Sequence, residues 1–389
     1  MTDDRDRRRL LVLAPFPPRL DAPHGGGRSV ARLVQLHATR NRVALLALRR
    51  PDEPEIDPAV AAACEIVREV ERVPVGRSVR VAWRERRRAL ALVRGRPLWV
   101  ASILTRAYAR AVVELCEEWR PDVVQAELGV MGAYLPLVPR PARRVVVEHD
   151  PTIRRDGGAV ASWSRRRFAR HPEADAVVVF TPEDHEALRP LVDPPARIAT
   201  IPLAWQLPTP ALDPVGGDPP TVLYVGNFGH PPNVAAARRL TALLPELRRR
   251  HPGVVLALVG EGAPADLAAS GALAPGRVDD VRPWLESASV VAAPIYEGGG
   301  TRVKIVEALS AGKAVVGTPR AFEGLDVDDG RNALVARDDD AFVEAISRLL
   351  ADPDLRRRLG AAARVWAEGL PTGDDVEGAY ETLYRSLET

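Results

Sequence analysis

The feature that most constrains the fold is a repeated alternation of short, continuous apolar runs with longer segments of helical spacing. Arg9–Ala14 and Val43–Leu48 are apolar runs, and a helix is predicted between them from near Ser29. Runs of this kind are typical of parallel strands buried on both faces of a sheet. Further short strands are predicted at Val123–Gln125, Val145–Glu148, Val177–Phe180 and Ile198–Ile201. The pattern predicts an α/β fold with a doubly wound parallel sheet.

A segment dense in Pro and Gly, residues 204–220, interrupts this alternation and is predicted to be a linker. The alternation then restarts, which predicts two tandem Rossmann-like domains, over residues 1–203 and 221–368, followed by a last helical segment over 369–389. Two such domains are expected to face each other across a cleft, a common place for ligands. The strands predicted in the second half are Thr221–Val225, Val254–Val259, Val290–Ala293 and Ala314–Gly317. Its predicted helices are Asn233–Arg250 with Asn233 as N-cap, Asp339–Ala351, Pro353–Glu368 and Asp374–Leu387.

Charge, cysteine content and the length of apolar runs indicate which classes of protein the chain can belong to. Residues 1–205 hold 35 Arg and 26 acidic residues, and the rest hold 19 Lys+Arg and 26 acidic residues, so balances of +9 and −7 sum to the net charge of +2. The two cysteines fit no metal or redox spacing, and no apolar run approaches the ~20 residues that span a bilayer. We therefore expect a cytoplasmic protein without a nucleic-acid partner. The arginine-rich stretches Arg84–Arg88 and Arg165–Arg167 favour peripheral contact with the inner face of an anionic membrane, or are solvated helix faces.

One run, from Tyr296 to Lys313, carries the strongest functional signal. It contains the only two lysines of the chain, Lys304 and Lys313, and three consecutive glycines before a predicted helix. Glycines at a helix N-terminus expose backbone N–H groups that suit an anion. Lys304 lies in the first turn, where the helix dipole disfavours a cation unless an anion is near. With Arg302 it predicts a diphosphate site, the alternative being two solvated side chains.

Lys313 and Glu307 are interpreted differently. Lys313 follows Gly312, a predicted C′ residue, and is expected to complement the dipole at the end of the helix. Glu307 lies three residues after Lys304 and shares its helix face. Its carboxylate either pairs with Lys304 or accepts hydrogen bonds from two sugar hydroxyls, as carboxylates do with ribose.

Two candidate sites lie in the first half. Gly25, Gly26 and Gly27 precede the helix predicted near Ser29 and form either a second anion loop or a flexible loop. They do not fit the G-x-G-x-x-G pattern of dinucleotide-binding folds. His149 follows a strand, where ligand-facing residues collect, and is either a donor or base of the site or a residue that caps the loop.

A family resemblance is carried by the segment VDDVRPWLESASVVAAPIYEGGGTRVKIVEALSAGKAVVGTPRAFEGL, by YVGNFGHPPN and LVGEG upstream of it, and by the glycine loop and EHD of the first half. The chain resembles GT-B fold glycosyltransferases of family 4, in the branch with a GGGTR-x-K-x-x-EA signature. The resemblance implies a retaining, metal-independent hexosyltransferase that uses a nucleotide-diphosphate sugar as co-substrate and no cofactor. It also implies that the last helix crosses back to the first domain.

The resemblance assigns roles to residues of this sequence. It implies that His149, Arg302 and Lys304 serve the transfer step, and that Gly25 to Gly27 lie near the diphosphate and an acceptor bound by the first domain. Residues implied in donor binding are Gly226, Asn227, Glu297, Gly299, Gly300, Thr301 and Glu307.

The sequence also departs from the family pattern. Glu297 and Glu307 have nine residues between them where many members have seven, and Gly226-Asn227-Phe228 stands where many have an Arg and a Lys. Lys304 is expected to replace the missing lysine. The acceptor stays open among glycans, lipid-linked and small molecules. The alternative functions are a sugar-nucleotide epimerase or phosphorylase of the same fold, or a non-catalytic binding module.

Overall fold

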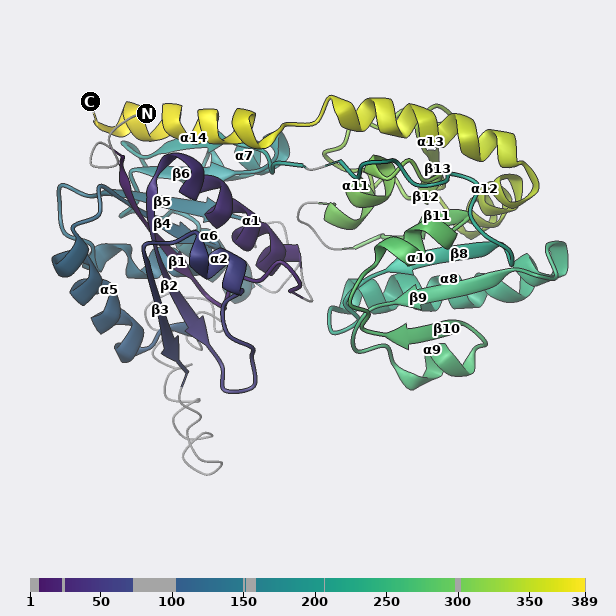
Figure 1. Ribbon diagram of the computed structural model, residues 1–389, viewed down its shortest axis with the longest axis horizontal. Coiled ribbons are helices and arrows are strands. Elements are labelled where there is room, and N and C mark those ends of the chain that lie inside the picture. Colours follow the sequence, from purple (N-terminus) through teal and green to yellow (C-terminus); the bar gives the residue numbers. More distant parts are fainter. Residues whose placement is uncertain are drawn as a thin grey trace. The chain divides into compact units, whose positions relative to one another are not determined.

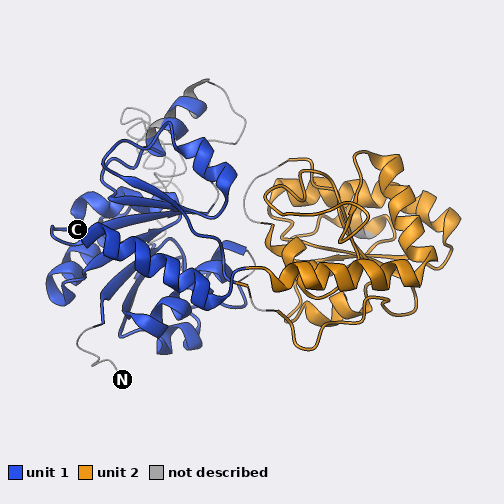
Figure 2. Ribbon diagram, turned by 90° about the horizontal axis from the view of Figure 1, so that it is seen from above, with its two compact units in different colours: residues 1–204, 299–301, 371–389 blue, residues 205–298, 302–370 orange. Residues whose placement is uncertain are grey.

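The protein folds into two compact units, coloured separately in Figure 2. The structure, a computed structural model, describes residues 7–22, 25–72, 103–149, 151, 159–205, 207–297 and 302–388. Unit 1 holds residues 1–204 and 371–389, and unit 2 holds residues 205–298 and 302–370. The last helix of the chain therefore belongs with the first half of the sequence.

Unit 1 is built on a seven-stranded parallel sheet with the order β3-β2-β1-β4-β5-β6-β7 (Figure 1). Chain order reverses between β1 and β4, which makes this position the switch point of a doubly wound sheet. The fold class predicted from the apolar runs is confirmed here. The strands are β1 (Arg9–Ala14), β2 (Arg42–Arg49), β3 (Ile66–Glu71), β4 (Val123–Glu127), β5 (Arg143–Glu148), β6 (Ala176–Val179) and β7 (Arg197–Thr200).

Helices cover both faces of this sheet. The first and last helices, α1 and α14, bury apolar residues against one face, and α5 with η2 covers the other. Figure 1 shows α14, in yellow, lying beside α1, although more than 300 residues separate them in the sequence. The helices described in unit 1 are α1 (Gly25–Arg40), α2 (Pro58–Ala62), α5 (Arg106–Trp119), η2 (Gly129–Leu137), α6 (Ala159–Phe168), α7 (Pro182–Leu188) and α14 (Gly373–Glu388).

Unit 2 repeats the architecture with six parallel strands in the order β10-β9-β8-β11-β12-β13. Its switch point lies between β8 and β11. The strands are β8 (Thr221–Val225), β9 (Val255–Val259), β10 (Leu273–Gly276), β11 (Val290–Ala293), β12 (Val315–Gly317) and β13 (Leu334–Val335). The helices are α8 (Pro231–Arg250), α9 (Ala265–Ala269), α10 (Arg282–Ser287), α11 (Val303–Ser310), α12 (Asp339–Ala351) and α13 (Pro353–Glu368).

Several expectations about individual elements were wrong. Asn233 does not cap α8, because the helix begins two residues earlier at Pro231. Proline suits the first helical position, since its fixed φ is helical and its missing N–H would lack a partner there. The sequence also gave no signal for β10, which contains proline and glycine and lies at a sheet edge, where strands are short. The sequence also predicts a helix over residues 78–120; its last part is α5, and residues 78–102 lie outside the described residues.

Lys313 follows the end of α11, as expected, but its ammonium group is buried in unit 2 and donates to carbonyls outside that helix. The side chain is 0% exposed, and Nζ donates to the backbone carbonyls of Asp213 and Glu286. Gly312 has a φ of +78°, so the chain turns there as expected of a C′ glycine. Lys313 thus ties the end of α11 to the segment that precedes β8. Burial lowers the pKa of its ammonium group to about 8.

Candidate functional site

Those of the predicted donor-binding residues that the structure describes follow the two strands at the switch point of unit 2. Gly226 and Asn227 follow β8, and Glu297 and α11 follow β11, the strand that pairs with β8. In open α/β sheets, ligands bind beyond the carboxyl ends of the strands at this position. The topology therefore brings together residues that are about 70 positions apart in the sequence.

Lys304 lies in the first turn of α11 and reaches the loop after β8. Its Nζ donates to Asn233 Oδ1 at 2.7 Å and to the Tyr224 hydroxyl at 3.4 Å, and it lies 5.0 Å from the centre of the Tyr224 ring. Asn233 also accepts from the Tyr224 hydroxyl at 2.9 Å and donates to the Asn227 carbonyl at 2.8 Å. The ammonium group is thus held at the loop after β8 by the side chains of Asn233 and Tyr224.

Tyr224 and Asn233 are the residues of this site that the sequence did not reveal. Tyr224 is the fourth residue of β8 and is buried, and burial raises the pKa of its hydroxyl well above the usual value. Asn233 lies in the first turn of α8, where it was interpreted as a cap. A polar residue at the start of a helix does not indicate in the sequence that its side chain contacts a lysine 71 positions later in the chain.

Glu307 lies one helical turn after Lys304 and is partly buried. Among the described residues, no side chain or backbone group makes a hydrogen bond or ion pair with its carboxylate. The expected alternative, a pair between Glu307 and Lys304, is therefore not formed. Glu297 is exposed, and the predicted donor residues Gly299, Gly300 and Thr301 lie outside the described residues.

Arg302 immediately precedes α11 and is 8% exposed. Its guanidinium Nη2 forms an ion pair with Glu323 Oε2 at 3.2 Å, and Glu323 also lies 3.7 Å from Arg320 Nη1. The Glu323 carboxylate partly compensates the charge of Arg302. Of the two cations predicted for the diphosphate, Arg302 therefore already forms an ion pair with a carboxylate of unit 2.

The loop after β8 is packed against the end of β9 by two glycines. Gly260 has a φ of +144°, and a Cβ at this position would lie 1.8 Å from the Gly226 carbonyl oxygen. No side chain fits there, so the close approach of the two strand ends requires glycine. The LVGEG segment of the sequence therefore shapes the loop that holds Asn227.

Gly260→Ala is expected to destabilise unit 2 by about 2 kcal/mol or more, because the new methyl group must displace the Gly226 backbone. Gly253→Ala is the matched control, since a Cβ at Gly253 would meet no atom within 4 Å. Chemical denaturation of the wild type and both variants gives the comparison. Equal midpoints for the two variants would contradict this interpretation of the packing.

The candidates in unit 1 lie at the corresponding edge of its own sheet. His149 directly follows β5, and its Nε2 lies 2.7 Å from Oε2 of Glu127, the last residue of β4. The His149 ring contacts Phe180 edge to face, with the ring centroids 4.8 Å apart. Glu127 was missed because a glutamate at the end of the run VVQAE is indistinguishable in sequence from a surface residue.

Gly25, Gly26 and Gly27 form the first turn of α1, so the expectation of a loop before a helix near Ser29 was wrong. Glycine is tolerated in a first turn, where the N–H groups have no partner within the helix. The glycines therefore present backbone N–H groups from the helix itself, and their role in anion binding stays a prediction.

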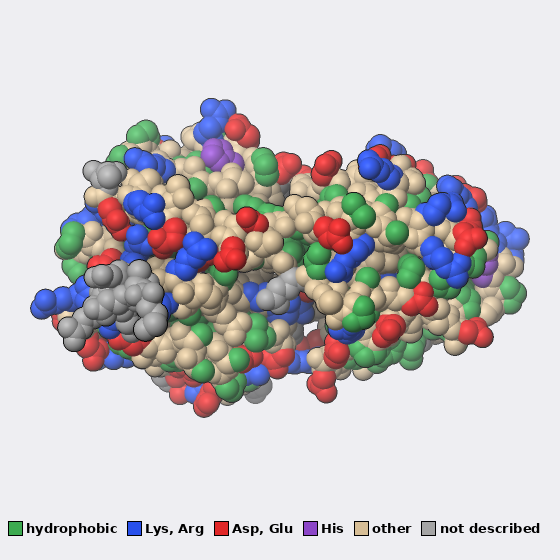
Figure 3. Space-filling model, turned by 45° about the horizontal axis from the view of Figure 1, so that its top comes forward, with side chains coloured by type: hydrophobic (Ala, Val, Ile, Leu, Met, Phe, Trp, Pro, Cys, Tyr) green, Lys and Arg blue, Asp and Glu red, His purple; other side chains and the backbone are tan. Residues whose placement is uncertain are grey.

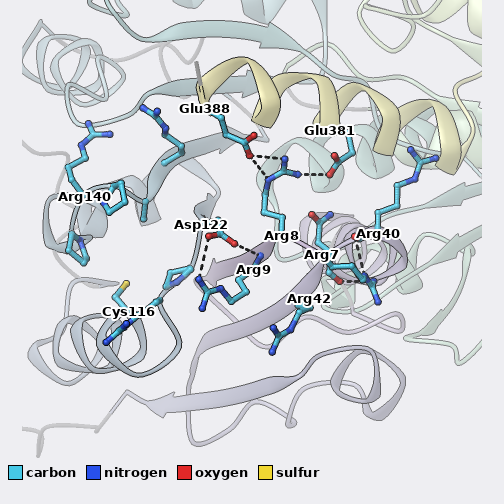
Figure 4. Close-up of a pocket in the computed structure, with 17 residues that line it drawn as sticks. Arg7, Arg8, Arg9, Arg40, Arg42, Cys116, Asp122, Arg140, Glu381 and Glu388 are labelled. Carbon is cyan, nitrogen blue, oxygen red and sulfur yellow. Dashed lines mark hydrogen bonds and ion pairs between the residues drawn. The ribbon is translucent and has the colours of Figure 1, made fainter. Parts of the chain in front are cut away.

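A cavity in unit 1 is lined largely by arginines and has a volume of about 1270 Å³ (Figure 4). Arg8 forms ion pairs with Glu381 and Glu388 at 2.6 and 2.9 Å, and Arg9 pairs with Asp122 at 3.5 Å. These pairs compensate part of the positive charge in the cavity, and the pairs of Arg8 join the start of β1 to α14. On the face seen in Figure 3, basic and acidic side chains are likewise interspersed.

The family comparison covers the second half of the chain. Residues 219–352 match the family model described as "Glycosyl transferases group 1". A phosphatidyl-myo-inositol mannosyltransferase of Mycolicibacterium smegmatis is 35% identical over 157 residues, which are 38% of this chain and 40% of the relative. The lipopolysaccharide core biosynthesis glycosyltransferase LpsE of Rhizobium meliloti is 31% identical over 193 residues, 46% of this chain and 52% of the relative. The match thus spans about half the length of these curated relatives or less.

Solved structures resemble the chain over nearly its full length. A sucrose-phosphate synthase from Thermosynechococcus elongatus superposes with a TM-score of 0.72 at 19% identity, covering 98% of this chain and 99% of the other. HepE of Anabaena, solved in complex with UDP-glucose, gives a TM-score of 0.67 at 15% identity, covering 96% and 99%. No helix within the described residues is long and apolar enough to cross a membrane. Residues 219–352 therefore match the model of group 1 glycosyl transferases, and the fold of the chain is the GT-B fold.

Proposed function

We propose that this protein is a retaining glycosyltransferase that moves a sugar from a nucleotide-diphosphate sugar to an acceptor without an essential metal ion. The observation that carries the proposal is the arrangement on α11 at the switch point of a domain that matches the model of group 1 glycosyl transferases. There Lys304 places an ammonium group in the first turn of the helix, bonded to Asn233 Oδ1, and Glu307 offers a carboxylate without a partner among the described residues. HepE, of the same fold, was solved with UDP-glucose.

In this proposal the diphosphate binds at the start of α11. Lys304 and the positive end of the α11 dipole stabilise the negative charge that develops on the leaving diphosphate. Arg302 adds a second, partly compensated positive charge. Glu307 accepts hydrogen bonds from the ribose hydroxyls, and the acceptor attacks the sugar from the face that the diphosphate leaves. Two protein cations supply the stabilisation that a divalent metal ion would otherwise provide.

The nucleotide is identified by thermal shift with UDP, GDP, dTDP and ADP. A ligand at about 100 times its dissociation constant stabilises the folded state by about 2.7 kcal/mol, which raises Tm by several degrees. One nucleotide is expected to raise Tm, equally with and without EDTA. Slow hydrolysis of the matching nucleotide sugar then supports a transferase, whereas formation of an epimeric sugar or phosphate-dependent release supports the alternatives. Absence of any shift would favour a non-catalytic binding module and contradict the proposal.

The acceptor is proposed to be lipid-linked, with the protein at the surface of an anionic membrane. The names of both curated relatives refer to lipid-containing molecules, phosphatidyl-myo-inositol and lipopolysaccharide. The first half of the chain also has a balance of nine positive charges. Sedimentation with vesicles containing anionic lipid is expected at low salt and should be lost at high salt, because exposed charges are screened there. Equal sedimentation with neutral vesicles, or none with anionic ones, would contradict this proposal.

A further inference from the structure

A chain of polar side chains crosses the buried interior of unit 1 and ends at His149. It begins at α14, where Glu377 Oε2 lies 2.9 Å from His37 Nδ1 of α1. His37 Nε2 lies 3.1 Å from Gln125 Nε2 of β4, and Gln125 Nε2 donates to Glu127 Oε1 at 2.6 Å. The other oxygen of Glu127 meets His149. His37, Gln125, Glu127 and Glu377 are all 0% exposed, so bulk solvent does not reach them.

The hydrogen-bond roles within this chain are fixed by chemistry. The Gln125 amide must direct its NH₂ group toward Glu127, because the opposite orientation would set an amide oxygen against a carboxylate. The Tyr384 hydroxyl of α14 donates to the amide oxygen and holds this orientation. The second amide hydrogen then points at His37 Nε2, which must accept it. His37 therefore carries its proton on Nδ1 and donates it to Glu377.

Glu127 receives a donor at each of its two carboxylate oxygens. Oε1 accepts from Gln125, and Oε2 accepts from His149, whose Nε2 therefore carries the proton. Among the described residues, His149 Nδ1 has no hydrogen-bond partner, and the side chain is 9% exposed. The buried carboxylate thus fixes both the orientation of the imidazole ring and the nitrogen that stays available to a ligand.

We propose that Glu127 is a positioning residue for the transfer reaction. It holds His149 as the Nε2–H tautomer and presents Nδ1 to the reacting sugar or its acceptor, and Tyr384 completes the arrangement through Gln125. This inference rests on the proposed function, because it assigns a role within the transfer step. It also gives the C-terminal helix a part in the site, since α14 supplies the hydroxyl that orients Gln125.

A second histidine–glutamate pair in the same unit provides a matched control. Glu148 ends β5 and its Oε1 lies 2.7 Å from His171 Nε2, and both side chains are buried. Glu148 belongs to the opposite face of the sheet from Glu127, because Glu127 pairs in register with Val147. Glu148→Gln therefore makes the same chemical change in a similar environment without touching His149.

The test replaces Glu127 by glutamine, which keeps the size of the side chain. Gln125 still donates to the amide oxygen of the new residue, so the new NH₂ group faces His149 Nε2 and forces the ring to carry its proton on Nδ1. Nitrogen-15 NMR of histidine-labelled protein is expected to show this exchange of tautomers at His149 in Glu127→Gln alone. The kcat of transfer should fall about 10- to 100-fold while KM for the donor changes less than twofold, because His149 stays in place with the wrong nitrogen protonated.

Glu148→Gln should leave the His149 signals and kcat unchanged. Tyr384→Phe, which removes one hydroxyl, should shift the His149 signals and lower kcat by a smaller factor. This variant provides the test if Glu127→Gln does not fold. Unchanged His149 signals in both Glu127→Gln and Tyr384→Phe would overturn the inference, as would a changed tautomer with wild-type kcat. A wild type that transfers no sugar would count against the proposed function instead, because the NMR comparison does not depend on turnover.

Discussion

Replacing Lys304 by alanine is expected to weaken binding of the nucleoside diphosphate about 30-fold and to lower the transfer rate further. A hydrogen bond to a charged group contributes about 1.5–3 kcal/mol, and about 2 kcal/mol corresponds to this change in the dissociation constant. The effect on rate adds to this, because the leaving diphosphate carries more charge in the transition state than in the bound donor. Calorimetric titration with the nucleotide found by thermal shift measures the first effect.

The fold should survive this substitution. Asn233 and Tyr224, the two partners of the Lys304 ammonium group, remain hydrogen-bonded to each other, and Asn233 remains bonded to the Asn227 carbonyl. Lys304→Met keeps the aliphatic stem over the Tyr224 ring and removes only the charge, so it should match the alanine variant in affinity. Wild-type affinity in both variants would show that the diphosphate lies elsewhere.

Replacing Lys313 by alanine is expected to act on stability instead. The buried Nζ donates to two backbone carbonyls, and the truncation removes both hydrogen bonds and opens a cavity. These losses are offset in part because a buried charge is removed. We expect a net loss of about 2 kcal/mol in the free energy of unfolding at pH 7, measured by chemical denaturation.

The effect of Lys313→Ala should grow with pH. The pKa of this ammonium group falls from 10.5 in the unfolded chain to about 8 in the folded one. Between these values the unfolded state binds more protons, so the stability of the wild type rises with pH through this window. At 1.36 kcal/mol per pH unit the full gain approaches about 3 kcal/mol, and the variant lacks it. A difference between wild type and variant that stays constant from pH 7 to 10 would contradict the burial of a charged Lys313.

The sequence predicted the bounds of an element well where the element's own residues form a clear apolar run or helix signal. β8, β11, α12 and α13 have the bounds that the apolar runs and helix signals gave. Asp338 and Asp352 cap α12 and α13 through their side chains, as residues of this type do at helix starts. Elements at the sheet edges, such as β10, bury little and left no such signal.

Contacts between distant residues could not be predicted in this way. The burial of Lys313 depends on carbonyls of Asp213 and Glu286, which only the folded backbone brings to one point. The role of Glu127 became visible only because the adjacent strand places His149 next to its carboxylate. For Lys304 the sequence signal was an apparent misfit, a cation in the first turn of a helix, and misfits of this kind mark functional positions.

The most direct test of the account uses the fact that the chain has only two lysines. Protein labelled with carbon-13 lysine should give two resolved side-chain ε-carbon signals, assigned through Lys304→Arg. Titration with the nucleoside diphosphate should shift the Lys304 signal in a saturable manner and leave the Lys313 signal in place, whereas the parent nucleoside should move neither. Nucleotide binding that leaves the Lys304 signal unchanged would contradict the assignment of the diphosphate to the start of α11.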